Sequence, residues 1–235
     1  MYQDLTRRFV ELLQLKQQPV GLAFVDIIPE GVAHTNKRVP SACTFWRLAE
    51  QGVFYATAED HQECPIGMIT MGFPMSEEVQ QHAQGLVETM SSVQYISPEE
   101  AQALPTVTKP HQSIVYGRLD QFPGEADVVL CILGPQQAML VAESQDHANW
   151  LQKVGESAFG RPTCAVIPRV LKTGNSGMSF GCVGARTYVN LAPSDMILAL
   201  PIAEFAPLVK RLETIVAANA ALAPFYQGQK EKFSA

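Results

Sequence analysis

Apolar residues recur along this chain at the spacing of amphipathic helices. The clearest case is residues 4–16, where one helical face carries Leu5, Phe9, Leu12 and Leu13 and Pro19 follows as a stop signal. A second such helix is predicted over residues 76–90. The same pattern, with Ser41 and Ser97 as expected N-caps, predicts further helices over residues 41–51, 97–104, 136–144 and 203–219.

Short apolar runs rich in β-branched residues predict buried strands between these helices. The first covers residues 19–28, and the others cover residues 53–57, 113–119, 127–133, 163–167 and 195–200. Strands and helices do not alternate strictly, which favours a mixed β-sheet packed with helices, an α+β (mixed α/β) fold. No linker interrupts the pattern, so we expect one globular domain over residues 1–235, with a polar, frayed tail at about 227–235.

Composition and charge narrow the class of protein. Hydrophobic residues make up 47% of the 235 residues and charged residues 17%, enough to form a large core. The net charge of −6 argues against nucleic acid and against an anionic membrane surface as partners. Charges interrupt the N-terminus and no segment reaches the roughly 20 apolar residues of a spanning helix. We therefore expect a cytoplasmic protein.

Five cysteines in a reducing compartment are expected to be thiols or metal ligands rather than disulfides. Cys131 lies in the middle of an apolar run and is predicted to be a buried strand residue. The other four lie near a predicted helix start or beside proline and glycine; they are Cys43, Cys64, Cys164 and Cys182. Glycine lets the backbone approach a cluster closely, and four thiolates are the number that a cubane cluster requires. We therefore predict that these four cysteines bind one [4Fe–4S] cluster.

Two alternatives to a cluster remain open at this stage. Four thiolates also suit a structural zinc ion, although no Cys-x-x-Cys pair is present and the pairs are separated by 20 and 17 residues. The cysteines could also belong to a metal-free protein that binds a small molecule or uses one thiol in catalysis. Without any of these sites, they would be four unrelated core or surface thiols.

His61 and Arg47 are candidates for catalysis beside the cysteines, and Arg186 is considered with Arg47. His61 precedes Cys64 by three residues and could be a ligand, a donor to a ligand or a proton carrier, or simply a solvated capping residue. Arg47 and Arg186 lie near Cys43 and Cys182, where each could offset thiolate charge, bind an anion or serve structure alone. The other histidines, His34, His82, His111 and His147, have no partner that the sequence identifies.

The order of these motifs resembles a known family. Residues 42–47 and 59–67, which contain Cys43 and Cys64, are similar to the characteristic stretch of the prokaryotic family called domain of unknown function 169. Similarity continues through residues 115–117, 126–129, 137–139 and 179–186, and spans about residues 19 to 212. The resemblance implies that Cys43, Cys64 and Cys182 occupy recurrent cysteine positions, and we expect the same of Cys164.

The resemblance implies no reaction, and the sequence contains none of the familiar catalytic motifs that would indicate one. The sequence contains no P-loop, no G-x-G-x-x-G after a strand, no H-E-x-x-H and no G-x-S-x-G. We therefore expect a redox or electron-transfer role with a redox partner or a small-molecule substrate, in a chain that could form homo-oligomers. Whether the protein is an enzyme is left undecided.

Overall fold

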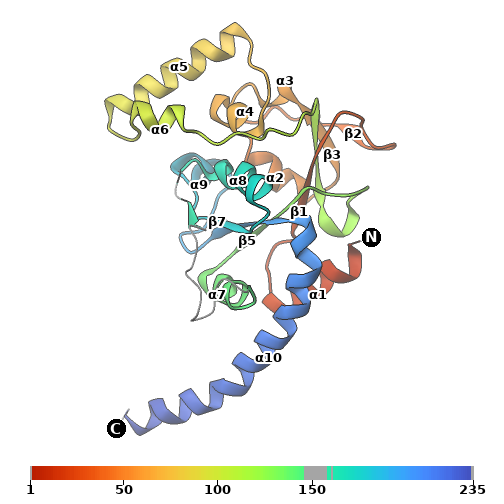
Figure 1. Cartoon of the computed structure of the whole chain (residues 1–235), viewed down its shortest axis with the longest axis vertical. Helices are drawn as coiled ribbons and strands as arrows, with labels where there is room; N and C mark the ends of the chain where they lie inside the picture. Colours follow the sequence, from red (N-terminus) through yellow and green to blue (C-terminus); the bar gives the residue numbers. More distant parts are fainter. Residues whose placement is uncertain (1, 146–157, 160, 234–235) are drawn as a thin grey trace.

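A computed structural model describes residues 2–145, 158–159 and 161–233, and these form one mixed sheet with helices on both faces (Figure 1). Within these residues the strand order is β2-β3-β4-β1-β5-β8-β7-β6. The strands are β1 (Val20–Val25), β2 (Ala33–His34), β3 (Phe54–Thr57), β4 (Ser113–Arg118), β5 (Val128–Leu133), β6 (Ala158–Phe159), β7 (Gly177–Ser179) and β8 (Met196–Pro201). The β2–β3 and β6–β7 pairs are parallel and the other pairs antiparallel, so the predicted α+β fold with a mixed sheet is confirmed.

Successive residues of the central strands point to opposite faces of the sheet and feed two separate cores. In β1, Leu22 and Phe24 pack with the first core and Ala23 with the second. The second core is covered by α1 (Gln3–Leu13), α7 (Pro135–Glu143) and α10 (Ile202–Lys232). The first core is covered by α2 (Thr44–Ala49), α4 (Pro65–Met71), α8 (Val166–Thr173) and α9 (Val183–Tyr188). The two layers of helices explain why the central strands are apolar on both faces.

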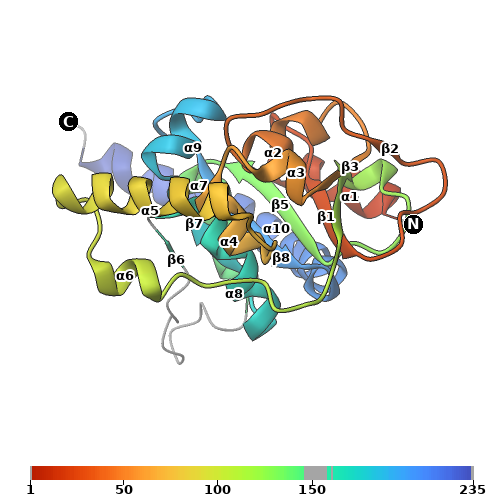
Figure 2. The ribbon, with the colours of Figure 1, turned by 90° about the horizontal axis from the view of Figure 1, so that it is seen from above.

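Two helices, α5 (Glu77–Ser92) and α6 (Pro98–Gln102), lie side by side away from the sheet, next to α4 (Figures 1 and 2). The Ser76 hydroxyl caps α5 by accepting the Val79 amide at 3.3 Å. Ser97 and Glu100 cap α6 reciprocally, with the Ser97 amide donating to the Glu100 carboxylate at 2.9 Å. Short helices complete the description: α3 (Ala58–His61), and the 3₁₀ turns η1 (Leu119–Gln121) and η3 (Thr163–Ala165).

The predicted strand at residues 163–167 is wrong. These residues form η3 and the start of α8, in which Val166, Ile167 and Val170 are buried at helical spacing. Pro168 falls in the first turn of α8, where a missing amide costs nothing, and Gly174 ends the helix with a φ of 69°. A short apolar run fits a strand or a buried helix equally well, and here the proline and glycine mark the helix.

Two helix ends also differ from their prediction. Helix α2 begins at Thr44 with Cys43 in the N-cap position, while the Ser41 hydroxyl lies 3.0 Å from that of Thr44. Helix α10 runs on to Lys232 and ends at Phe233, so residues 227–232 of the expected polar tail are helical. Gln, Lys and Glu in this tail are good helix formers and extend an existing helix at little cost. Figure 1 shows the last turns of α10 projecting from the body.

Candidate functional site

A pocket of about 440 Å³ lies on the face of the sheet that carries the first core. It is lined by Cys43, Cys64, Cys164 and Cys182, which we call the cysteine wall. Cys131 packs in the second core, on the other face of the sheet, and is buried as predicted. The structure therefore brings together four of the five cysteines and separates the fifth from them.

Each cysteine of the wall is positioned by the end of a short element. Cys43, Cys64 and Cys182 occupy the N-cap positions of α2, α4 and α9, and Cys164 lies in η3 just before α8. The side chain of Thr163 joins two of these segments, because its hydroxyl accepts the Cys182 amide at 2.6 Å. Thr163 is itself fully buried, so this link holds the segments of Cys164 and Cys182 together.

Every sulfur of the wall has a hydrogen-bond donor nearby. The groups that can donate are the Ser41 hydroxyl for Cys43, the Ala42 and Gly67 amides for Cys64, and the Ala185 amide at 3.5 Å for Cys182. For Cys164 it is the Thr70 hydroxyl at 3.1 Å, whose single proton is shared with the Ile66 and Gly67 carbonyls at 3.0 Å. Amide and hydroxyl donors stabilise a thiolate more than a thiol. These donors partly offset the cost of burying a charged sulfur atom.

Gly67 makes room for the Cys64 sulfur. A Cβ atom at this position would lie 2.9 Å from Cys64 Sγ and 2.7 Å from the Ala42 Cβ, which is closer than real Cβ contacts. Only glycine therefore lets the first turn of α4 approach this sulfur closely.

Burial and mutual repulsion raise the pKa of three wall cysteines, Cys43, Cys64 and Cys164, and so favour their thiol form. Burial raises the pKa of Cys43 well above its usual value, and the charges of Cys164, Cys64 and Cys182 raise it further. Burial raises the pKa of Cys164 to about 12, with contributions from Cys64 and Cys182. The pKa of Cys64 is raised by burial first, against the opposing effect of the two amides. The four thiols are thus close enough to interact electrostatically.

The spacing of the wall does not match a single metal ion. Among the described residues, no group of three His, Cys, Asp or Glu side chains gathers closely enough to hold one ion. Four sulfurs around zinc, each at about 2.3 Å, would nearly touch one another. A cubane spreads its ligands farther apart because iron and sulfide atoms occupy the space between them.

His61 lies behind the cysteine wall rather than in the pocket. It is 1% exposed, and its Nδ1 donates to the Thr57 carbonyl at 2.6 Å. Nε2 then accepts the Tyr116 hydroxyl at 2.9 Å, and burial lowers the His61 pKa to about 4. Burial raises the pKa of Tyr116, and Cys43, Cys164 and Cys64 raise it further, so this buried pair lies close to the wall.

The two arginines singled out in the sequence stabilise loops beside the wall and do not line the pocket. Arg47 donates to the Val189 carbonyl at 3.0 Å and pairs with Glu50 at 3.0 Å, which joins α2 to the end of α9. Arg186 donates to carbonyls of the segment around α9, at Phe180, Ala192 and Asp195. We assign both to the positioning of α2 and α9.

Three of the remaining histidines have partners or positions that the sequence did not reveal. His34 pairs with Asp60 at 2.8 Å, and His111 packs its ring against Phe24 with a centroid distance of 4.9 Å. His82 is exposed at the edge of the pocket. His147 lies outside the described residues.

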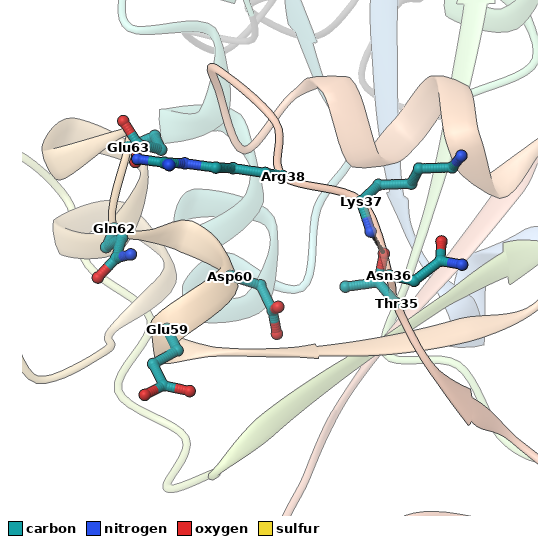
Figure 3. Close-up of a pocket in the computed structure, with 8 residues that line it drawn as sticks. All are labelled: Thr35, Asn36, Lys37, Arg38, Glu59, Asp60, Gln62 and Glu63. Atoms are coloured by element: carbon teal, nitrogen blue, oxygen red, sulfur yellow. Dashed lines mark hydrogen bonds and ion pairs between the residues drawn. The ribbon is translucent and has the colours of Figure 1, made fainter.

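A second, polar groove lies between the segment after β2 and the α3–α4 turn (Figure 3). Its charges are largely paired: Figure 3 shows Arg38 extended to Glu63, and Asp60 accepts from the Thr57 amide at 2.7 Å in addition to pairing with His34. Lys37 points away from these acidic side chains in the same view. The groove therefore has the character of a solvated, ion-paired surface, and the cysteine-walled pocket is the better candidate site.

The fold and the site define an α+β protein with a small-molecule-sized pocket walled by cysteines. The chain belongs to the DUF169 family, described as uncharacterised ArCR, whose profile matches residues 8–211. No curated protein and no solved structure matches the chain. None of the helices in the described part of the chain is long and apolar enough to cross a membrane.

Sequence reasoning missed several residues of the site. Thr70 and Thr163 support the sulfurs, and Arg161 is one of the residues that line the pocket. Gly67 was not among the missed residues, because glycine beside a cysteine was part of the prediction from the sequence. The two threonines gave no such signal, because their contacts join residues that are far apart in the sequence.

Proposed function

We propose that the cysteine wall binds a [4Fe–4S] cluster through Cys43, Cys64, Cys164 and Cys182. The observation that carries the proposal is the convergence of four cysteines from four separate segments on one pocket, each with a donor directed to its sulfur. Such a cluster supplies one-electron redox chemistry when bound. We infer a redox or electron-transfer role, with a small molecule in the adjoining space as its counterpart.

The chain's own residues have definable tasks in this proposal. The Ala42, Gly67 and Ala185 amides would stabilise thiolate charge and so raise the reduction potential. Gly67 keeps the space beside Cys64 Sγ free of a side chain. The half-buried positions of Cys64 and Cys182 leave the wall accessible from the pocket.

Structural zinc is the weaker alternative because the described residues contain no compact group of ligands for one ion. A metal-free catalytic thiol is also weaker. Reactive cysteines have a lowered pKa, whereas burial raises that of Cys43, Cys64 and Cys164. A cytoplasmic location, which we propose with the cluster, would keep the thiols reduced before assembly.

The test is metal analysis of the whole chain purified and reconstituted without oxygen. We expect about four iron and four acid-labile sulfide per chain, as a [4Fe–4S] cluster contains. Cys→Ala at position 43, 64, 164 or 182 should reduce the iron content by more than half. Cys131→Ala is the matched control, since Cys131 is buried like Cys43 and Cys164 but lies on the other face of the sheet.

Urea unfolding of each metal-free variant separates loss of ligation from loss of the fold. The proposal fails if reconstituted wild-type protein holds neither iron nor sulfide. It also fails if Cys131→Ala loses as much iron as the four wall variants. One zinc per chain that depends on the same four cysteines would replace the cluster with the zinc alternative.

A further inference from the structure

The pocket wall that faces the cysteines is apolar and incompletely covered. The apolar stripe of α5 begins with Val79 and Ala83, which are buried. It continues with Leu86, Val87 and Met90, which are only half-buried and line the pocket. The second half of this stripe therefore borders the open space of the pocket and is only partly covered by the protein.

The neighbouring elements extend this apolar surface around the pocket. Ile66 and Ile69 of α4 and Ile96 and Leu104 on either side of α6 are likewise half-buried lining residues. The volume of about 440 Å³, part of which the proposed cluster would occupy, falls within the roughly 300–1,000 Å³ typical of small-molecule sites. Half-covered apolar side chains around such a space favour an apolar ligand, because each would lose water-exposed area on binding.

One cationic side chain marks the mouth of the pocket. Arg161 is the only lysine or arginine among the described lining residues. Its guanidinium stacks over the Tyr95 ring at 4.4 Å, which orients the group and leaves its N–H edges available. Its ion pair with Glu100 is 3.8 Å long, beyond hydrogen-bond distance, and its side chain is 41% exposed.

Each acidic residue of the described lining has a hydrogen-bond partner other than Arg161. Glu63 pairs with Arg38 on the side of the polar groove. The Glu100 carboxylate accepts the Ser97 amide and so serves the cap of α6. Arg161 is thus the one cationic group in the described lining with which an incoming carboxylate could form a charge-assisted hydrogen bond, in competition with Glu100.

We propose that the pocket binds a small, mainly apolar molecule with one carboxylate, which pairs with Arg161 while its apolar part lies along α4 and α5. This identifies the class of small molecule that would lie beside the cluster. The inference rests on the proposed function for the chemistry the ligand would undergo, whereas the binding is a property of the pocket alone.

The probes are octanoate and its neutral analogue octanamide, titrated calorimetrically into the metal-free protein and into the reconstituted protein. Octanoate should bind about tenfold more tightly than octanamide, since a charge-assisted hydrogen bond to Arg161 is lost in the neutral analogue. Arg161→Gln should abolish this preference and leave octanamide binding unchanged. Leu86→Ala should weaken both ligands by a similar factor.

Lys37→Gln is the matched control, because it removes one positive charge from the polar groove instead. The inference is overturned if neither probe binds, or if the preference for octanoate survives Arg161→Gln. Octanoate binding by a protein that takes up no iron would support the proposed ligand site and contradict the proposed cluster. A reconstituted protein that holds iron and sulfide but binds neither probe would support the cluster and contradict the ligand site.

Discussion

At the scale of single residues, the main finding is that a candidate catalytic group proved to be a core residue. His61 was singled out by its closeness to Cys64 in the sequence, yet it hydrogen-bonds Tyr116, 55 residues away. Sequence proximity fixes neither burial nor partners. The buried pair instead connects the aromatic core to the back of the cysteine wall.

The burial of His61 predicts a loss of stability in acid. Its pKa falls from 6.5 to about 4 on folding, so between these values the unfolded chain takes up a proton that the folded chain does not. The free energy of unfolding should therefore fall as the pH drops from 6.5 to 4, by about 3 kcal/mol from this group.

His61→Gln, which does not titrate, is the comparison. Urea unfolding of both proteins at several pH values should show a smaller loss between pH 6.5 and 4 in the variant. Parallel pH profiles would contradict the assignment of this acid sensitivity to His61.

Gly67 predicts a steric effect on the wall. Gly67→Ala should lower the free energy of unfolding by about 1–3 kcal/mol and reduce iron uptake, because the new Cβ would overlap the Cys64 sulfur and Ala42. Gly85→Ala in α5 is the control: its Cβ meets nothing within 4 Å, and the change should stabilise the protein by about 0.5–1 kcal/mol. Equal effects of the two substitutions would show that Gly67 has no steric role.

At the scale of elements, apolar periodicity predicted the long helices and strands but not the short helices that position the cysteines. The stripes of α1 and α5 and the apolar runs of β1, β4 and β5 were sufficient to predict these elements. The helices that position Cys64 and Cys182 have only seven and six residues, too few for a periodic signal. Cys164 was placed in a strand for the same reason, since its apolar run is too short to show a period of 3.6.

The candidate pocket depends on element placement that no local pattern contains. The α5 stripe indicated an apolar face, but whether that face would meet the core or a ligand depends on the direction in which α5 and α6 leave α4. Arg161 likewise reaches Tyr95 only through the tertiary fold. The four cysteines could be identified from their residue type, whereas the apolar residues on the other side of the pocket could not.

At the scale of the whole molecule, the body and the end of α10 differ in how they are held. Phe205, Leu208, Val209 and Leu212 are buried against the sheet, whereas Leu222, Phe225 and Tyr226 are more than half exposed. The family match ends at residue 211, close to this change.

This difference predicts that the last turns of α10 contribute little to the stability of the body. Removal of residues 220–235 should change the free energy of unfolding by no more than about 0.5 kcal/mol, because residues 220–233 bury little apolar area. Leu212→Ala should cost about 2–5 kcal/mol in the same urea experiment. A truncation cost that grows with protein concentration would instead show that these turns pair with a second copy.

The order of the wall cysteines along the chain has a consequence for persistence in the cell. Strands β3 to β7 all lie between Cys43 and Cys182 in the sequence. A cluster bound by both cysteines would therefore cross-link the two ends of a long loop that contains most of the sheet. Such a cross-link restricts the unfolded chain much as a disulfide does, typically by about 2–4 kcal/mol. Oxidative loss of the cluster would remove this cross-link and lower the stability of the fold. The protein would then be degraded more readily, so exposure to oxygen would shorten its lifetime.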